Sequence, residues 1–145
     1  MRNNKGFTLI ELLAVIVILA IIAVITVPRI ASMIEDSRKG AAKDAAFGVV
    51  KAVELGYAKA LQTNPSLGAV TCTTVSNNTI TCNAGETEAY TTQVSGTAPT
   101  AVNISVASGG SVIYDAAENG VKSTVTVNGY TCTGDSSAMS CVKAS

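Results

Sequence analysis

The sequence turns abruptly apolar at residues 5–27, which read KGFTLIELLAVIVILAIIAVITV. Residues 7–27 hold 18 apolar residues out of 21, and the exceptions are Thr8, Glu11 and Thr26. At a rise of about 1.5 Å per residue, a helix of this length spans roughly 30 Å, the thickness of the hydrocarbon core of a bilayer. The stretch therefore predicts a membrane-spanning helix over residues 7–28.

Two simpler interpretations of this stretch leave something unexplained. A cleaved secretory signal peptide has an apolar region of about 7–15 residues that ends in a small-x-small site. This run is longer, and Val27-Pro28-Arg29 offers no such site. A plain membrane anchor fits the length but not Glu11, because a carboxylate toward the middle of a bilayer costs about 2.5–3.5 kcal/mol. Glu11 is therefore expected to have a partner and a function.

The residues just before the apolar run suit proteolytic processing. Gly6 has no side chain, so a peptidase at the membrane surface can reach the backbone there. Cleavage after Gly6 would make Phe7 the new N-terminus, with a positively charged amine. Glu11 lies one helical turn later, where the helix dipole favours an anion. The new amine of a neighbouring subunit can supply the cation that a carboxylate in hydrocarbon needs.

This junction resembles the N-terminus of type IV prepilins and of the related pseudopilins of type II secretion and competence systems. The resemblance covers residues 1–28, with no departure at Gly6, Phe7 or Glu11. It implies a leader over residues 1–6, which a prepilin peptidase removes between Gly6 and Phe7 before it methylates the Phe7 amine.

Beyond the leader, the resemblance implies a fold and an assembly route. Pro28 matches the family's helix-kinking proline, whose ring removes one backbone hydrogen bond. Glu11 and Pro28 are the two residues expected to serve assembly. A single-pass precursor would wait in the inner membrane with its N-terminus in the cytoplasm. An assembly platform and its ATPase would then drive it into a helical homopolymer, through an outer-membrane secretin if the cell is Gram-negative. The stretch from Pro28 to Lys59 looks most like the mannose-sensitive haemagglutinin group of pilins.

An amphipathic helix is predicted over residues 29–62, continuing the apolar one. Gly40, Gly48 and Gly56 recur along it every eight residues. Each weakens an isolated helix by roughly 1 kcal/mol relative to Ala. Small residues also permit helices to approach closely, and both interpretations stay open. The expected buried stripe, at steps of three and four, comprises Ala42, Ala46, Val49, Val50, Val53, Tyr57 and Ala60, while Phe47 and Leu55 lie off it.

The remaining residues, 63–145, predict a β-rich head, because Thr and Ser are abundant and the helical period is lost. Hairpin turns are expected at Ser76-Asn77-Asn78 and at Asn128-Gly129, and a loop or short helical turn at 115–120. The whole chain is thus expected to be α+β, a long N-terminal helix packed on an antiparallel sheet, the type IV pilin fold. Strands are predicted at Val70–Val75, Thr79–Asn83, Val102–Val106, Val112–Tyr114, Thr124–Val127 and Tyr130–Thr133.

The head contains all four cysteines, Cys72, Cys82, Cys132 and Cys141. Their even number in a small polar region suggests disulfides and an oxidising compartment. Four cysteines allow three pairings, and local pairing would give Cys72–Cys82 and Cys132–Cys141. The pilin resemblance adds that a disulfide commonly closes a C-terminal loop, which suits the second pair. Free buried thiols and a crossed pairing are the alternatives.

Composition argues against an enzyme. The chain has no His and no Trp, which excludes a His-based triad and a His zinc site, and no acid, base and nucleophile are seen together. No cofactor or metal is expected. Asp115, Glu118 and Asp135 are the only candidates for the calcium site that many major pseudopilins carry, and their spacing is unremarkable.

Sequence features disagree on one point, the orientation of the chain in the membrane. Arg29, Arg38, Lys39 and Lys43 follow the apolar segment, against only Arg2 and Lys5 before it. A positive-inside count would leave the C-terminus in the cytoplasm, whereas the cysteines and the leader place it outside.

The predicted function is structural: the subunit of a type IV pilus that binds a host or abiotic surface and serves adhesion, surface motility or biofilm formation. The alternative is a pseudopilin of a type II secretion or competence system.

Overall fold

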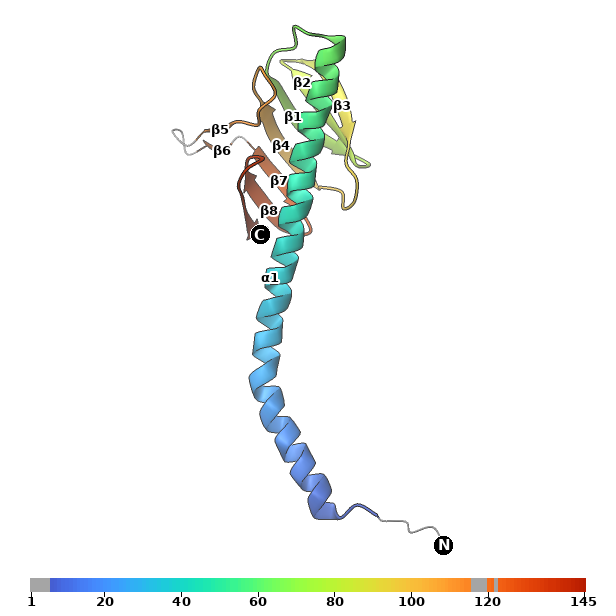
Figure 1. Ribbon diagram of the computed structural model, residues 1–145, viewed down its shortest axis with the longest axis vertical. Helices are drawn as coiled ribbons and strands as arrows, with labels where there is room; N and C mark the ends of the chain where they lie inside the picture. The colour runs from blue at the N-terminus through green and yellow to red at the C-terminus, as the bar shows by residue number, and fades with distance from the viewer. Residues whose placement is uncertain (1–5, 116–119, 122) are drawn as a thin grey trace. The chain divides into compact units, whose positions relative to one another are not determined.

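The computed structural model describes residues 6–115, 120, 121 and 123–145. One helix, α1, runs from Leu9 to Thr63, and strands β1 to β9 follow it (Figure 1). The larger sheet is antiparallel throughout. The predicted α+β, pilin-like fold, one long N-terminal helix packed on an antiparallel sheet, is confirmed. Two compact units divide the chain between Ser37 and Arg38, within α1.

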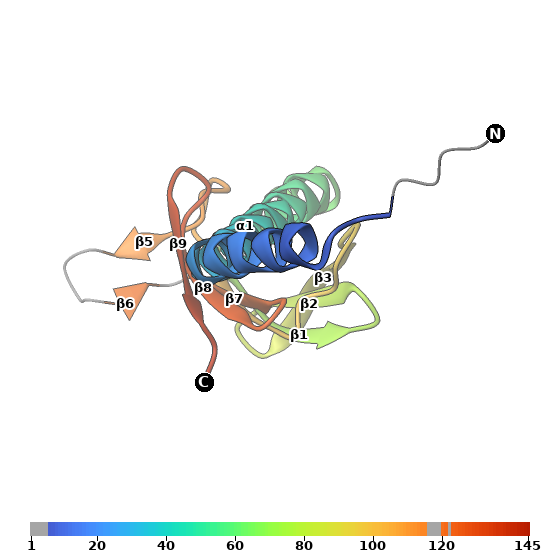
Figure 2. The same cartoon turned by 90° about the horizontal axis from the view of Figure 1, so that it is seen from below.

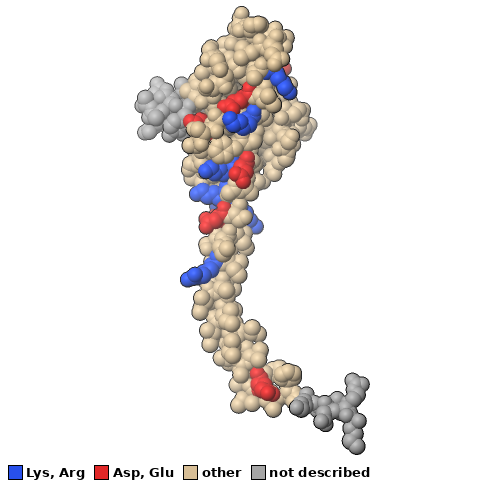
Figure 3. All heavy atoms as spheres, in the orientation of Figure 1, with Lys and Arg blue, Asp and Glu red and all other residues tan. Residues whose placement is uncertain are grey.

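In the first unit, α1 is uncovered. Every side chain from residue 7 to residue 37 is exposed, including the large hydrophobic side chains from Leu9 to Ile34. Figure 3 shows that uncharged atoms cover most of this part of α1, with an acidic side chain near its N-terminal end. Between residues 7 and 37 the charged residues are Glu11, Arg29, Glu35 and Asp36. By length and composition, α1 is the one described helix that could cross a membrane. An apolar surface this extensive needs lipid or other chains to cover it.

In the second unit, one face of α1 is buried. The predicted stripe is confirmed from Ala42 to Tyr57, whereas Ala60 is only partly buried. Of the two residues expected off the stripe, Phe47 is partly buried, with the Lys43 ammonium 5.8 Å from the centre of its ring. Leu55 is exposed. The fully buried residues of this face are Ala42, Ala46, Val49, Val50, Val53 and Tyr57.

The sheet has seven strands in the order β3-β2-β1-β4-β7-β8-β9. Figure 2 shows the C-terminal part of α1, from Arg38 onward, over one face of this sheet. A separate pair joins β5 (Tyr114–Asp115) to β6 (Gly120–Val121). The strands of the larger sheet are β1 (Val70–Ser76), β2 (Thr79–Ala84), β3 (Thr87–Gln93), β4 (Ala101–Val106), β7 (Ser123–Val127), β8 (Tyr130–Gly134) and β9 (Met139–Lys143).

Alternation along the strands separates the two faces of the sheet. In β7, Val125 and Val127 are fully buried, and the threonines between and before them are partly exposed. The buried positions form one hydrophobic core with the stripe on α1. The other face carries threonine pairs such as Thr126 and Thr131, whose hydroxyl oxygens are 3.3 Å apart across β7 and β8. Threonine suits this face because a β-branched side chain fits a pleated, half-exposed surface.

Both predicted hairpins are confirmed. Asn77 and Asn78 connect β1 to β2 with φ angles of 46° and 63°. Asn128 and Gly129 connect β7 to β8 with φ angles of 54° and 75°. Two successive positive φ angles characterise the type I′ turn, which Asn and Gly adopt most readily and whose twist matches the flanking strands.

The strand predictions missed two strands and were wrong in the extent of a third. β3 and β9 were not expected, because Thr87–Gln93 and Met139–Lys143 lack a sustained apolar alternation. The strand predicted at Val112–Tyr114 is wrong in extent: Val112 makes only an isolated bridge to Val106, and Tyr114 begins β5. The loop or helical turn predicted at 115–120 falls largely on residues 116–119, outside the described residues.

Candidate functional site

The predicted cleavage point lies just before α1. Gly6 and Phe7 are both exposed, and 88% of the Phe7 side chain is accessible. Among the described residues, and apart from its chain neighbours, a β-carbon built on Gly6 would meet no atom within 4 Å. The chain itself therefore has no steric need for glycine at this position. Any such need comes from a partner that binds the backbone closely, as a peptidase does.

Thr8 and Glu11 form the N-terminal cap of α1. A Glu11 carboxylate oxygen, Oε2, accepts hydrogen bonds from the backbone nitrogen and from the hydroxyl of Thr8, each at 2.8 Å. In return, the Glu11 backbone nitrogen donates to Thr8 Oγ1 at 3.3 Å. This reciprocal arrangement is a capping box, in which two otherwise unpaired helix N–H groups find acceptors.

The capping box gives Glu11 a partner within its own chain. The sequence analysis treated Thr8 only as an exception in an apolar run, although Thr-Leu-Ile-Glu has the T-x-x-E spacing of a capping box. Thr8 is therefore a site residue that the sequence analysis missed and that its own pattern could have revealed. An interaction between Glu11 and a neighbouring amine would have to add to these bonds or replace them.

Pro28 lies inside α1 and does not end it. Because proline has no N–H, the carbonyl oxygen of Val24, four residues earlier, lacks its usual helical donor. Two hydroxyl side chains nearby hydrogen-bond to backbone carbonyls: Thr26 to Ile22, and Ser32 to Arg29. Such bonds at a spacing of three or four residues bend helices and weaken the backbone ladder. The turns around Pro28 are thus held less tightly than an ordinary helix.

The cysteines are paired locally, Cys72 with Cys82 and Cys132 with Cys141. Each disulfide joins residues directly opposite each other on neighbouring strands, with Cα atoms 4.0 Å apart. Between β1 and β2, this alignment depends on a β-bulge between Cys72 and Thr74. In a regular hairpin, the two-residue turn would place Thr73 opposite Cys82 instead. The bulge therefore sets the register that brings Cys72 opposite Cys82.

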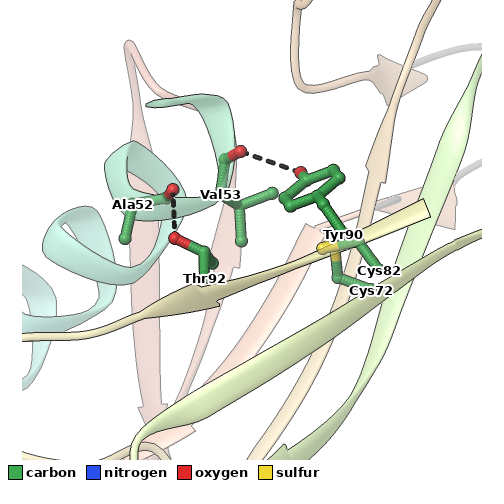
Figure 4. Close-up of a disulfide and its surroundings, with 6 residues drawn as sticks. All are labelled: Ala52, Val53, Cys72, Cys82, Tyr90 and Thr92. Carbon is green, nitrogen blue, oxygen red and sulfur yellow. Dashed lines mark hydrogen bonds between the residues drawn. A yellow bond between two sulfur atoms is a disulfide. The ribbon is translucent and has the colours of Figure 1, made fainter. Parts of the chain in front are cut away.

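Beside the first disulfide, β3 is attached to α1 by side chains (Figure 4). Tyr90, which lies opposite Cys82, donates a hydrogen bond from its hydroxyl to the carbonyl oxygen of Val53 at 2.9 Å. Thr92 donates in the same way to Ala52 at 3.0 Å. Burial, and secondarily the nearby Tyr57, raise the pKa of Tyr90 above its usual range. The hydroxyl therefore stays protonated and remains a donor.

The described residues contain no group of three or more metal-ligating side chains. Of the three candidate calcium ligands, Glu118 lies outside the described residues. Asp135 is engaged in its own turn: its carboxylate accepts hydrogen bonds from the Ser137 hydroxyl and from the backbone nitrogens of Ser137 and Ala138. These bonds, led by that of the Ser137 hydroxyl, lower the pKa of Asp135. Asp135 thus serves the bend between β8 and β9.

Comparison with known proteins bears on the N-terminal segment. The family model of the prokaryotic N-terminal methylation motif matches residues 1–27. No curated protein and no solved structure matches the chain. The matched residues include Gly6, Phe7, Thr8 and Glu11, so the capping box lies within the motif. The leader and the apolar helix fit a membrane-anchored precursor. The match is to a type IV pilin-like leader and covers residues 1–27 alone.

Proposed function

We propose that the chain is the structural subunit of a type IV pilus, an extracellular homopolymer that serves adhesion, surface motility or biofilm formation. The observation that carries this proposal is the exposed apolar surface of α1 from Leu9 to Ile34, which follows a methylation motif. In the precursor, membrane lipid covers this surface. In the fibre, the same surface on neighbouring copies covers it.

The proposal gives the other parts of the chain their roles. The peptidase cuts between Gly6 and Phe7 and methylates the new amine, and the assembly platform, its ATPase and, in a Gram-negative cell, the secretin move the subunit outward. The head has no enzymatic activity and needs no cofactor or metal. Its two disulfides and Thr/Ser-rich surface suit an oxidising, extracellular position, where the fibre binds a host or abiotic surface. Among pilins, the mannose-sensitive haemagglutinin group is the one we favour.

A pseudopilin of a type II secretion or competence system is the alternative, because the methylation motif is shared. The two candidates differ in where the polymer is found. We expect negative-stain microscopy with an antibody to the head to show long labelled fibres on cells that make this chain and none on cells that lack it. Fibres absent from the cell surface, with the chain retained in the periplasm of cells active in secretion, would favour the pseudopilin.

A further inference from the structure

The apolar surface of the first unit is longer than a membrane is thick. The exposed large hydrophobic side chains on this part of α1 reach from Leu9 to Ile34. At about 1.5 Å per residue, this stretch measures roughly 39 Å, whereas the hydrocarbon core of a bilayer is about 30 Å thick. The helix up to Pro28 is long enough to fill the core by itself. The apolar side chains beyond Pro28 therefore need a different environment from those before it.

The helix changes character where the spanning segment ends. Residues 12–25 are apolar on all sides. Beyond Pro28, Ile30, Met33 and Ile34 follow at the spacing i, i+3, i+4 and so share one side of α1, where they are 52%, 69% and 48% exposed. An evenly apolar helix suits the bilayer core. A helix that is apolar on one side only suits the boundary between acyl chains and headgroups.

The other side of the same turns is polar. Arg29, Ser32 and Asp36, at the spacing i, i+3, i+7, share it, and all three side chains are exposed. Arg29 directly follows the spanning segment, where its guanidinium can form charge-assisted hydrogen bonds to lipid phosphates. Pro28 and the hydrogen bond from the Ser32 hydroxyl to the Arg29 carbonyl loosen the helix at this point, so the segment can change direction there.

We propose that residues 29–37 of the membrane-anchored subunit lie along the membrane surface, with Ile30, Met33 and Ile34 against the acyl chains and Arg29 at the lipid phosphates. The inference rests on the membrane-anchored state that the proposed function includes, and it applies to a pilus subunit and to a pseudopilin alike. It gives this segment a partner before assembly, a phospholipid surface, which it leaves when the subunit enters a fibre.

Fluorescence measurements of depth in the membrane test this contact. All four cysteines are in disulfides, so a single introduced thiol can carry an environment-sensitive nitrobenzoxadiazole label. The full chain is placed in vesicles of phosphatidylethanolamine and phosphatidylglycerol, with the label at Ser32→Cys, Ile34→Cys or Asp36→Cys. The label at 34 should emit further to the blue than those at 32 and 36. Nitroxides on the upper acyl chain should quench it most, and iodide in the water should quench it least.

The order of the three positions distinguishes the possible arrangements. A helix that continues straight out of the membrane would hold Ser32 nearer to the bilayer core than Ile34 or Asp36. Quenching by the lipid nitroxides that falls steadily from 32 to 36 would therefore overturn the contact. A label at 34 that is protected from iodide but not quenched by the nitroxides would show that a second copy covers this side, and would overturn it as well.

Two further variants keep the result interpretable. Ile16→Cys, within the spanning segment, should be quenched by nitroxides deep in the acyl chains. If it is not, the chain is not anchored, and the proposed precursor fails together with this inference. If it is, a negative result at 34 concerns the contact alone. Ile30→Ser/Met33→Ser leaves the spanning segment intact and should expose the label at 34 to iodide; a label that stays protected would overturn the role of the apolar side.

Discussion

A β-carbon on Gly56 of α1 would lie 2.6 Å from Cε2 of Tyr90 on β3 and 3.0 Å from Cβ of Thr92. These are the side chains whose hydroxyl groups hydrogen-bond to α1 at Val53 and Ala52. Glycine therefore lets the edge strand approach the helix closely enough for both bonds to form. The close approach at Gly56 is that of a strand, whereas close approach between helices, one of the two interpretations of the helix glycines, stays a prediction. At Gly48, nothing lies within 4 Å of the corresponding position.

The first prediction compares these two glycines. Gly56→Ala should destabilise the head by roughly 1–3 kcal/mol, because the added methyl group displaces Tyr90 or Thr92. Gly48→Ala should stabilise it by roughly 0.5–1 kcal/mol, because alanine favours the helix and the site is open. Chemical denaturation of the full chain in detergent, followed by circular dichroism, measures both changes. Equal effects of the two substitutions would refute the close-approach argument.

The second prediction concerns Tyr90 and alkaline pH. The pKa of Tyr90 is raised in the folded state. In the unfolded chain it has the ordinary tyrosine pKa of about 10. Above that pH the unfolded state loses its proton first, so the free energy of unfolding should fall as the pH rises further. Tyr90→Phe cannot titrate and should lose less stability between neutral and strongly alkaline pH. A wild-type stability curve that is flat in this range, or parallel to that of the variant, would contradict the assignment.

Some features of the fold follow from local sequence and others do not. The buried stripe of α1 was predictable because its period is helical, and the Asn128-Gly129 hairpin because only a few residues tolerate two positive φ angles. Strand β3 was not predictable, because its place is set by Tyr90 and Thr92, which bond to a helix about 40 residues earlier. At the candidate site, the sequence singles out Gly6, Phe7 and Glu11, and their roles stay predictions. The role of Thr8 became clear only from the hydrogen bond between its hydroxyl and the Glu11 carboxylate.

The third prediction concerns the disulfide at the edge of the sheet. Cys132–Cys141 ties β9, which has a neighbour on one side only, to β8. Replacing both cysteines with serine should cost roughly 2.5–3 kcal/mol of head stability in the chain-entropy model. Peptide mapping without reduction should find Cys132 linked to Cys141 in the wild-type chain, and the thermal midpoint of the variant should fall. Four free thiols in the secreted chain would overturn the pairing.

The fourth prediction concerns processing. Gly6→Val should leave uncut precursor in the membrane, because a branched side chain would keep the peptidase from the backbone. Since a β-carbon at Gly6 meets none of the described residues beyond its chain neighbours within 4 Å, the defect should lie in cleavage and not in folding. Asn4→Ala, in the same leader, should be cut normally. Mass spectrometry of wild-type fibres should find a chain that begins at Phe7 with one added methyl group; a fibre subunit that retains Met1 would exclude this processing.

The last prediction separates the two roles of Glu11, as a helix cap and as a charge. In the subunit, its carboxylate is bonded to Thr8. In a fibre, the Phe7 amine of a neighbouring copy could approach it. At an effective dielectric constant of about 20, a pair 4 Å apart attracts by roughly 4 kcal/mol, from which desolvation subtracts. The main value of such a pair would be register, because a subunit would dock stably only where the two charges meet.

Three substitutions distinguish these roles. Glu11→Ala should enter the membrane at least as well as the wild type and be cleaved, yet give few or no fibres. Glu11→Gln can still accept the bonds from Thr8 and cap the helix, but it carries no charge, so it should fail in the same way. Thr8→Val loses the hydroxyl and keeps the carboxylate, so it should still form fibres. Fibre yield by shearing and electron microscopy measures all three. Normal yield from Glu11→Gln, with loss of fibres in Thr8→Val, would show that Glu11 acts through the helix cap and that a charge pair does not drive assembly.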